Sequence, residues 1–273
     1  MSDYFLNNRL KNGKIAGLCY SAFRDGQSPV TRIYPTAEQI REDFALIKNC
    51  RKIRLYSLHG PNNIAEIAGE YKLAVSQGIW LDRNILRNKK EMSLGIECSK
   101  KVKSIKVVTV GNEVLKSQFM NCQKLIEYLR QAKKHIDLPI STSERPKFWF
   151  ANSELVEEVD FIALNIFPYW EGVKIENAVS YIQNTLQQLA KKYVGKEIVI
   201  YDTGWSSAGL TDKKAIPSVE NENKYLDDIT AFCTKNKIQY YFFEAFDESW
   251  KRLAEKEVGA HYGIYTQDRI AKF

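Results

Sequence analysis

Side chains that could do acid–base chemistry follow several short apolar runs of this sequence. Asp202 ends one such run in the stretch IVIYDTGWSSAG (198–209), where an acid could equally be a helix cap or a turn former. Several acids around one cleft would be harder to explain as scaffolding, because repulsion and desolvation raise the pKa of some carboxyl groups and cost stability. The polar and aromatic residues that end such runs are Tyr56, Asp82, Asn112, Glu113, Glu144, Asn165, Tyr169, Asp202, Trp205, Glu244, Asp247, Glu248 and Trp250.

The sequence lacks the patterns of other common catalytic sites. It has no G-x-G-x-x-G, phosphate loop or G-x-S-x-G, and its three histidines, His59, His135 and His261, lack metal-ligand spacing. We therefore expect no metal site. Carboxylates with tryptophan, tyrosine and asparagine suit a neutral polyhydroxylated substrate, because carboxyl groups can act as acid and nucleophile, indoles stack on sugar faces and amides bind hydroxyls.

The apolar runs that carry these residues predict the fold. Several are apolar at every position, as expected of parallel strands covered on both faces. Apolar residues at helical spacing lie between them, first at Ile40, Phe44 and Ile47 after the cap-like Thr36, then within 125–136 and 179–189. This alternation predicts an α/β fold, a single (β/α)8 TIM barrel over residues 1–273, with a doubly wound open sheet as the alternative. The expected strands are 15–20, 52–57, 78–82, 105–113, 138–144, 159–169, 197–205 and 239–248.

Composition narrows the class of protein. The chain has 273 residues and a formal net charge of +7, but its basic residues are scattered and match no nucleic-acid fold signature, so we expect no nucleic-acid partner. Its five cysteines form no C-x-x-C pair and are odd in number, which favours reduced thiols. Residues 1–14 show no leader pattern and no run has membrane-spanning length. We expect a cytoplasmic monomer, or a periplasmic or extracellular one if a leader or the rest of a larger protein is missing.

Six segments together resemble the family-17 glycoside hydrolases, which are β-1,3-glucanases and β-1,3-glucan glucosyltransferases. They are AGLCYSAFRDGQSP (16–29), IRLYS (53–57), VVTVGNEVL (107–115), LNIFPYW (164–170), IYDTGW (200–205) and FFEAFDESWK (242–251). The resemblance runs in order from about Gly17 to Lys251, and V-G-N-E with E-A-F-D-E-x-W-K is a specific pair of motifs. It implies a barrel enzyme that cleaves or transfers β-1,3-glucan with retention of configuration, without cofactor or metal.

The resemblance also implies roles residue by residue. Glu113 matches the general acid/base, Asn112 matches a residue that hydrogen-bonds the sugar 2-hydroxyl, and Asp202 stands at the position of the nucleophile. Trp205 is expected to wall the cleft beside the nucleophile, or to be an ordinary core tryptophan. The other expected substrate-binding residues, which would shape the cleft or face the sugar, are Tyr20, Tyr56, Glu144, Asn165, Tyr169, Glu244, Asp247, Glu248, Trp250 and Lys251.

Asp202 departs from the family pattern, in which a glutamate begins an E-x-G-W-P-S motif. A retaining mechanism needs its two carboxyl groups roughly 5 to 5.5 Å apart, and the loss of one methylene withdraws the carboxylate by about 1.5 Å. Three interpretations follow. Asp202 is a natural nucleophile with a compensating backbone, or a weakened or engineered one, or a turn residue that leaves Glu244 as the nucleophile.

The main functional prediction is therefore a retaining hydrolase or transglycosylase acting on β-1,3-glucan. The competing prediction is a barrel that binds glucan with little or no turnover, and a more distant one is a hydrolase of another β-linked glycan. In the enzyme, Glu113 must be protonated to begin the reaction, so activity should follow a bell-shaped pH profile with an acidic to neutral optimum.

Overall fold

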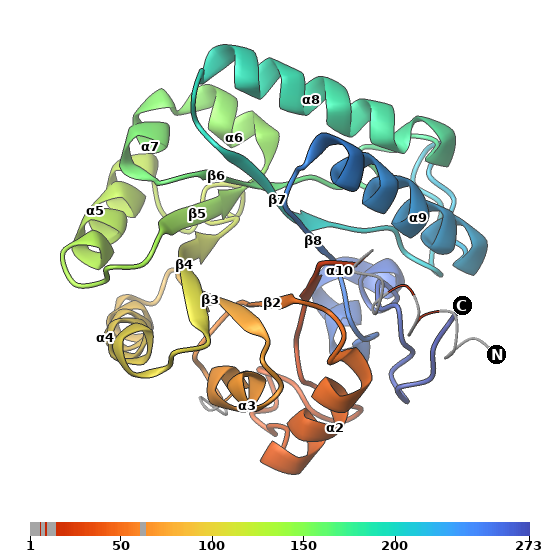
Figure 1. Ribbon diagram of the computed structural model, residues 1–273, viewed down its shortest axis with the longest axis horizontal. Helices are drawn as coiled ribbons and strands as arrows, with labels where there is room; N and C mark the ends of the chain where they lie inside the picture. Colours follow the sequence, from red (N-terminus) through yellow and green to blue (C-terminus); the bar gives the residue numbers. More distant parts are fainter. Residues whose placement is uncertain (1–5, 7–8, 10–14, 61–63) are drawn as a thin grey trace.

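The structure, a computed structural model, describes Leu6, Arg9 and residues 15–60 and 64–273. Within these residues eight parallel strands close into a barrel in sequence order, and the long helices surround it (Figure 1). The predicted (β/α)8 barrel is confirmed. Most of segment 1–14, in which we expect no leader pattern, lies outside the described residues. The strands are β1 (Gly17–Cys19), β2 (Lys52–Leu55), β3 (Ala74–Ile79), β4 (Ile105–Asn112), β5 (Ile140–Glu144), β6 (Ile162–Asn165), β7 (Ile198–Thr203) and β8 (Tyr240–Phe242).

The helices follow the strands in the order expected of parallel connections. Among the described residues, none of them is both long and apolar enough to cross a membrane. The α-helices are α2 (Ala37–Ile47), α3 (Ile64–Glu70), α4 (Ile85–Lys101), α5 (Cys122–Lys133), α6 (Pro146–Ala151), α7 (Ser153–Glu158), α8 (Ala178–Lys192), α9 (Val219–Asn236) and α10 (Arg252–Gly259), with short 3-10 turns η1 (Ile175–Asn177) and η2 (Ser249–Lys251).

Local sequence explains where α2 begins and which side it buries. The Thr36 hydroxyl accepts from the backbone N–H of Gln39 at 3.2 Å, and the Gln39 side chain accepts from the Thr36 N–H at 3.0 Å, which forms a reciprocal capping box. Ile40, Phe44 and Ile47 are completely buried, as their spacing predicts. The stripe thus fixes α2 against the barrel.

The third strand lies earlier than the sequence predicts. We expect it at 78–82, but β3 spans Ala74–Ile79 and residues 80–82 belong to the loop that leads into α4. The polar residues Ser76 and Gln77 hide the strand from a search for apolar runs, although both side chains are almost fully buried. The correction places Asp82 three residues beyond the end of its strand.

Two backbone features shape the ends of β4 and β7. Glu113 has φ +50, a left-handed conformation that is uncommon outside glycine and costs energy, and its N–H donates to the Ser143 carbonyl at 2.7 Å. Gly204 follows β7, where a Cβ atom would lie 2.0 Å from the Phe243 carbonyl oxygen, so only glycine fits. Both features lie at the carboxyl ends of strands, where barrels place functional groups.

Candidate active site

Asp202 lies at the end of β7 and receives three donors from neighbouring strands. The Cys19 thiol of β1 donates to its Oδ1 at 2.9 Å, and the Tyr56 hydroxyl, just after β2, donates to the same oxygen at 2.8 Å. The Arg54 guanidinium of β2 forms an ion pair with Oδ1 as well. Among the described residues, no donor contacts Oδ2 of Asp202. Oδ1 is therefore the oxygen that the protein holds.

The charge of this cluster is fixed by its surroundings. Burial works against the Arg54 cation, but the Asp202 carboxylate outweighs it and the pKa of Arg54 is raised. The Tyr56 and Tyr201 rings lie 4.4 and 4.8 Å from the Arg54 guanidinium carbon. Burial and the Asp202 charge raise the pKa of Tyr56 well above its usual value, and they raise the pKa of Cys19 in the same way. Tyr56 and Cys19 therefore remain protonated donors, and Arg54 remains charged.

A hydrogen-bonded network joins Asp202 to Glu113. The second arm of Arg54 donates to Asn112 Oδ1 at 2.8 Å, at the end of β4. Asn165 at the end of β6 donates to the same Asn112 oxygen at 3.0 Å and lies 3.5 Å from Glu113 Oε1. The Asn112 amide nitrogen has no partner among the described residues, so it can donate to a bound hydroxyl. The structure thus brings Glu113, Asn112, Asn165, Tyr56 and Asp202 together.

Glu113 is held by two cations. Arg145 donates from Nε to Oε1 at 3.0 Å, and the Lys116 ammonium lies 2.8 Å from Oε2. Burial acts to raise the pKa of Glu113, but Arg145 and Lys116 outweigh burial and the net pKa is lowered. The Glu113 side chain is 13% exposed. It can carry a proton only under acidic conditions or when a ligand changes these contacts.

Glu244 belongs to a separate buried cluster after β8. Both of its oxygens accept from the Lys251 ammonium at 2.5 Å, and Lys251 also lies 2.7 Å from Glu248. The Ser21 hydroxyl donates to Glu248 at 2.6 Å. Burial raises the pKa of Glu244 well above its usual value, although the Lys251 charge opposes this. Since both Glu244 oxygens are taken, this residue has less room to act as a nucleophile than Asp202.

Several predicted substrate-binding residues are buried and bonded to the protein. Trp205 is completely buried and its indole N–H donates to the Ile216 carbonyl at 3.0 Å, so it lies in the core instead of walling a cleft. Tyr20 donates to Asp43 at 3.0 Å and Tyr169 to the Leu210 carbonyl at 2.5 Å. The Glu144 carboxyl group accepts a hydrogen bond from the Leu115 N–H at 2.6 Å. These positions favour a supporting role for the four residues, and direct sugar contact stays a prediction.

Two further predicted residues lie in the loop after β8. Asp247 accepts the Gly263 N–H at 2.8 Å and pairs with Lys272 at 2.9 Å, which ties the loop to the chain end. Trp250 is partly exposed, packs edge-on against Phe23 at 5.9 Å between ring centres, and leaves its buried indole nitrogen without a partner among the described residues. Trp250 is therefore less enclosed than Trp205.

The sequence reasoning overlooked the cations and the thiol that hold the two acids. Arg54 was detectable, because a charge inside the apolar run IRLYS needs a buried partner. Arg145 and Lys116 carry no such signal, since cations next to helices are usually solvated. For Cys19 the sequence predicts only a reduced thiol. In the described part of the chain, no group of three His, Cys, Asp or Glu residues is placed to hold a metal ion.

Comparison with known proteins identifies a glycoside hydrolase domain in this chain. A family model described as the BtgE/BtgC glycoside hydrolase domain matches residues 17–263. Curated relatives include a probable glucan endo-1,3-beta-glucosidase btgC of Aspergillus fumigatus, 26% identical over 279 residues that cover 90% of this chain and 40% of the relative. The putative btgC enzyme of Aspergillus niger matches with the same identity and coverage. The chain thus spans about 40% of the length of these relatives.

Solved structures with the same architecture include a glycoside hydrolase family 17 β-1,3-glucanosyltransferase from Rhizomucor miehei. It is 28% identical, with a TM-score of 0.84 and coverage of 94% of this chain and 95% of that one. An active-site mutant of the Rhizomucor enzyme, in complex with laminaritriose, matches with 27% identity and the same TM-score and coverage. An endo-laminarinase from Formosa, 20% identical with a TM-score of 0.81 and coverage of 96% and 86%, shares the fold.

Proposed function

We propose that this chain, which belongs to the BtgE/BtgC glycoside hydrolase domain family, cleaves or transfers β-1,3-glucan with Glu113 as acid/base and Asp202 as nucleophile. The observation that carries the proposal is the network from Asp202 through Arg54 and Asn112 to Asn165 and Glu113. It joins two carboxyl groups at the ends of β7 and β4. The names of the relatives and of the Rhizomucor structure support β-1,3-glucan as the substrate.

The proposed reaction begins with Glu113 protonated and Asp202 ionised. Oδ2 of Asp202, the oxygen without a protein donor, attacks the anomeric carbon, and Glu113 gives its proton to the departing glycosidic oxygen. The Asn112 amide nitrogen donates to the sugar 2-hydroxyl. Glu113, now a base, takes a proton from water or from a sugar hydroxyl, which attacks the glycosyl-enzyme and restores the original configuration. Water gives hydrolysis and a sugar gives transfer.

The contacts of Asp202 also favour one second candidate, a barrel that binds glucan and turns it over slowly. Three donors hold Oδ1 of a side chain that is one methylene shorter than the family's glutamate. A misplacement of about 1 Å can lower the rate about a hundredfold. Binding without measurable turnover over long incubation would favour this candidate.

Product analysis with end-labelled β-1,3-gluco-oligosaccharides tests the proposal. The native chain is compared with Glu113→Gln, Asp202→Asn and Asp202→Glu. We expect shorter products from hydrolysis, or longer ones from transfer, and their loss in the first two variants. Undiminished turnover by Glu113→Gln would refute the acid/base assignment. A large gain in Asp202→Glu would identify a weakened nucleophile. A monomeric state and the compartment remain predictions from the sequence.

A further inference from the structure

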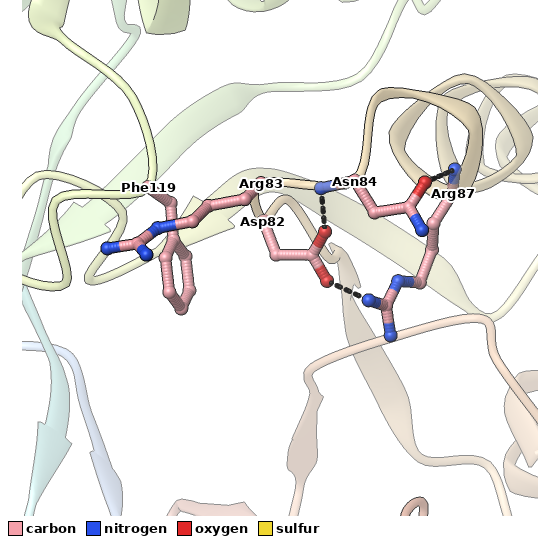
Figure 2. A pocket seen from close by; sticks show the side chains of 5 residues that line it. All are labelled: Asp82, Arg83, Asn84, Arg87 and Phe119. Atoms are coloured by element: carbon pink, nitrogen blue, oxygen red, sulfur yellow. Dashed lines mark hydrogen bonds and ion pairs between the residues drawn. The ribbon is translucent and has the colours of Figure 1, made fainter.

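A pocket lies between the loop after β3 and the loop after β4. It has a volume of about 660 Å³ and is lined by Asp82, Arg83, Asn84, Arg87 and Phe119 (Figure 2). We call it the α4 pocket, because Asn84 caps the start of α4. The Phe119 N–H donates to the Val114 carbonyl at 3.0 Å, and Val114 directly follows Glu113. The α4 pocket therefore opens on the same end of the barrel as the two acids.

Arg83 is the distinctive residue of the α4 pocket. Its side chain extends alongside Phe119 (Figure 2), with the guanidinium carbon 6.0 Å from the ring centre. Among the described residues no carboxylate pairs with Arg83, and the residue is exposed. A guanidinium supported by an aromatic ring keeps its planar fork of N–H donors available, which matches the two oxygens of a carboxylate or phosphate.

The acidic residue of the α4 pocket does not neutralise Arg83. Asp82 is engaged elsewhere, because its Oδ2 pairs with Arg87 at 2.9 Å and its Oδ1 accepts the Asn84 N–H at 2.6 Å (Figure 2). The first turn of α4 holds no acidic residue, so the positive end of the helix is not offset there. With Asp82 matched by Arg87, Arg83 leaves the α4 pocket with a surplus positive charge.

We propose that the α4 pocket binds an anionic group, a carboxylate or a phosphate, that is attached to the β-1,3-glucan chain. The proposal rests on the proposed function. Where a glucan bound at Glu113 extends along the loop after β4 toward Phe119, Arg83 is the cation that would pair with a charged substituent there. A neutral glucosyl unit would stack on the face of the Phe119 ring. Arg83 lies along that ring, and a neutral sugar would leave its positive charge without a partner.

Binding to two soluble glucans tests the proposal. Dissociation constants for neutral laminarin and for carboxymethylated β-1,3-glucan are measured by calorimetry in a Glu113→Gln background, which prevents cleavage. The same measurements are made after adding Arg83→Gln, and after adding Lys90→Gln as the control. Lys90 is an exposed cation of α4 outside the α4 pocket, so both variants lose one positive charge. Thermal melting of each variant verifies the fold.

We expect a preference for the carboxymethylated glucan that falls about tenfold in Arg83→Gln, the loss of one charge-assisted contact, and that stays in Lys90→Gln. A preference unchanged in Arg83→Gln, or lowered equally by both variants, would overturn the proposal. Inorganic phosphate serves as a third ligand, and an Arg83-dependent site for phosphate without any preference among glucans would also overturn it. Failure of the native chain to act on neutral laminarin would instead refute the proposed function.

Discussion

Arg54 and Asp202 form an ion pair inside the barrel mouth, with side chains only 1% and 4% exposed. Such a pair is costly to break from one side, because the remaining charge stays buried without a partner. Arg54 also contacts Asn112 at 2.8 Å and Ser143 at 3.1 Å. One cation therefore sets the position of the proposed nucleophile and of the residue beside the proposed acid.

We first predict strong coupling between these two residues in stability. Arg54→Gln alone should lower the free energy of unfolding by about 3 to 5 kcal/mol, since Asp202 is then a buried charge without its partner. Adding Asp202→Asn to Arg54→Gln should recover part of this loss. Urea unfolding of the native chain, both single variants and the double variant gives the coupling energy. Strictly additive losses would show that the two charges do not stabilise each other.

A second prediction concerns the Cys19 thiol. Cys19→Ala removes one donor from Oδ1 of Asp202, so we expect kcat to fall about three- to tenfold, in keeping with one modest hydrogen bond. Cys19→Ser retains a donor and should recover most of the loss. Steady-state rates on laminarin, with matched melting temperatures, make the comparison. Equal rates in the alanine and serine variants would show that the thiol only fills space.

The cations around Glu113 lead to a third prediction, on pH. Their charges lower the pKa of Glu113, and activity needs its protonated form, so kcat/KM should fall as pH rises through this lowered pKa. Lys116→Met or Arg145→Met should raise the pKa of Glu113 and carry the alkaline limb of the profile to higher pH. Lys147→Met is the control, because Lys147 makes no ion pair with Glu113. An alkaline limb that stays in place in both variants would contradict the assignment.

Glu144 gives a fourth prediction, on stability. Burial raises the pKa of Glu144 to about 8, while the Leu115 N–H opposes the shift and the Glu113 charge adds to it. A carboxyl group whose pKa is higher in the folded state favours folding when protonated, so its contribution is lost as pH rises from about 4.5 to 8. The unfolding free energy of the native chain should fall as pH rises through that window. In Glu144→Gln this fall should be smaller by roughly 3 kcal/mol. Denaturation at pH 5 and pH 8 measures the difference, and an unchanged slope would be the contrary result.

The sequence predicts the architecture well because the strands are covered on both faces and therefore mostly apolar. It misplaces β3, where the polar residues Ser76 and Gln77 point into tight packing instead of water. It singles out Glu113 and Asp202 through the resemblance of the segments that contain them, and their catalytic roles stay predictions. It does not identify their partners, since the contact of Cys19 with Asp202 joins residues 183 positions apart.

The sequence also does not predict which of the aromatic residues are buried. A tryptophan after a strand can face the cleft or the core, and only the packed chain shows that the Trp205 indole donates to Ile216. The burial of Lys251, which pairs with both Glu244 and Glu248, is also not predictable from the sequence. A lysine on a short turn is usually solvated, but this one is only 6% exposed. Motif resemblance pointed to these segments, and the packing shows which of their atoms are bonded within the protein.

Covalent trapping of the nucleophile tests the central claim most directly. The chain is incubated with a 2-deoxy-2-fluoro-β-laminaribiosyl fluoride, which forms a glycosyl-enzyme that hydrolyses slowly, and the adduct is located by peptide mass spectrometry. We predict one added fluoro-disaccharide on the peptide that contains Asp202, and none in Asp202→Asn. An adduct on Glu244, or cleavage of laminarin with no adduct at all, would contradict the account.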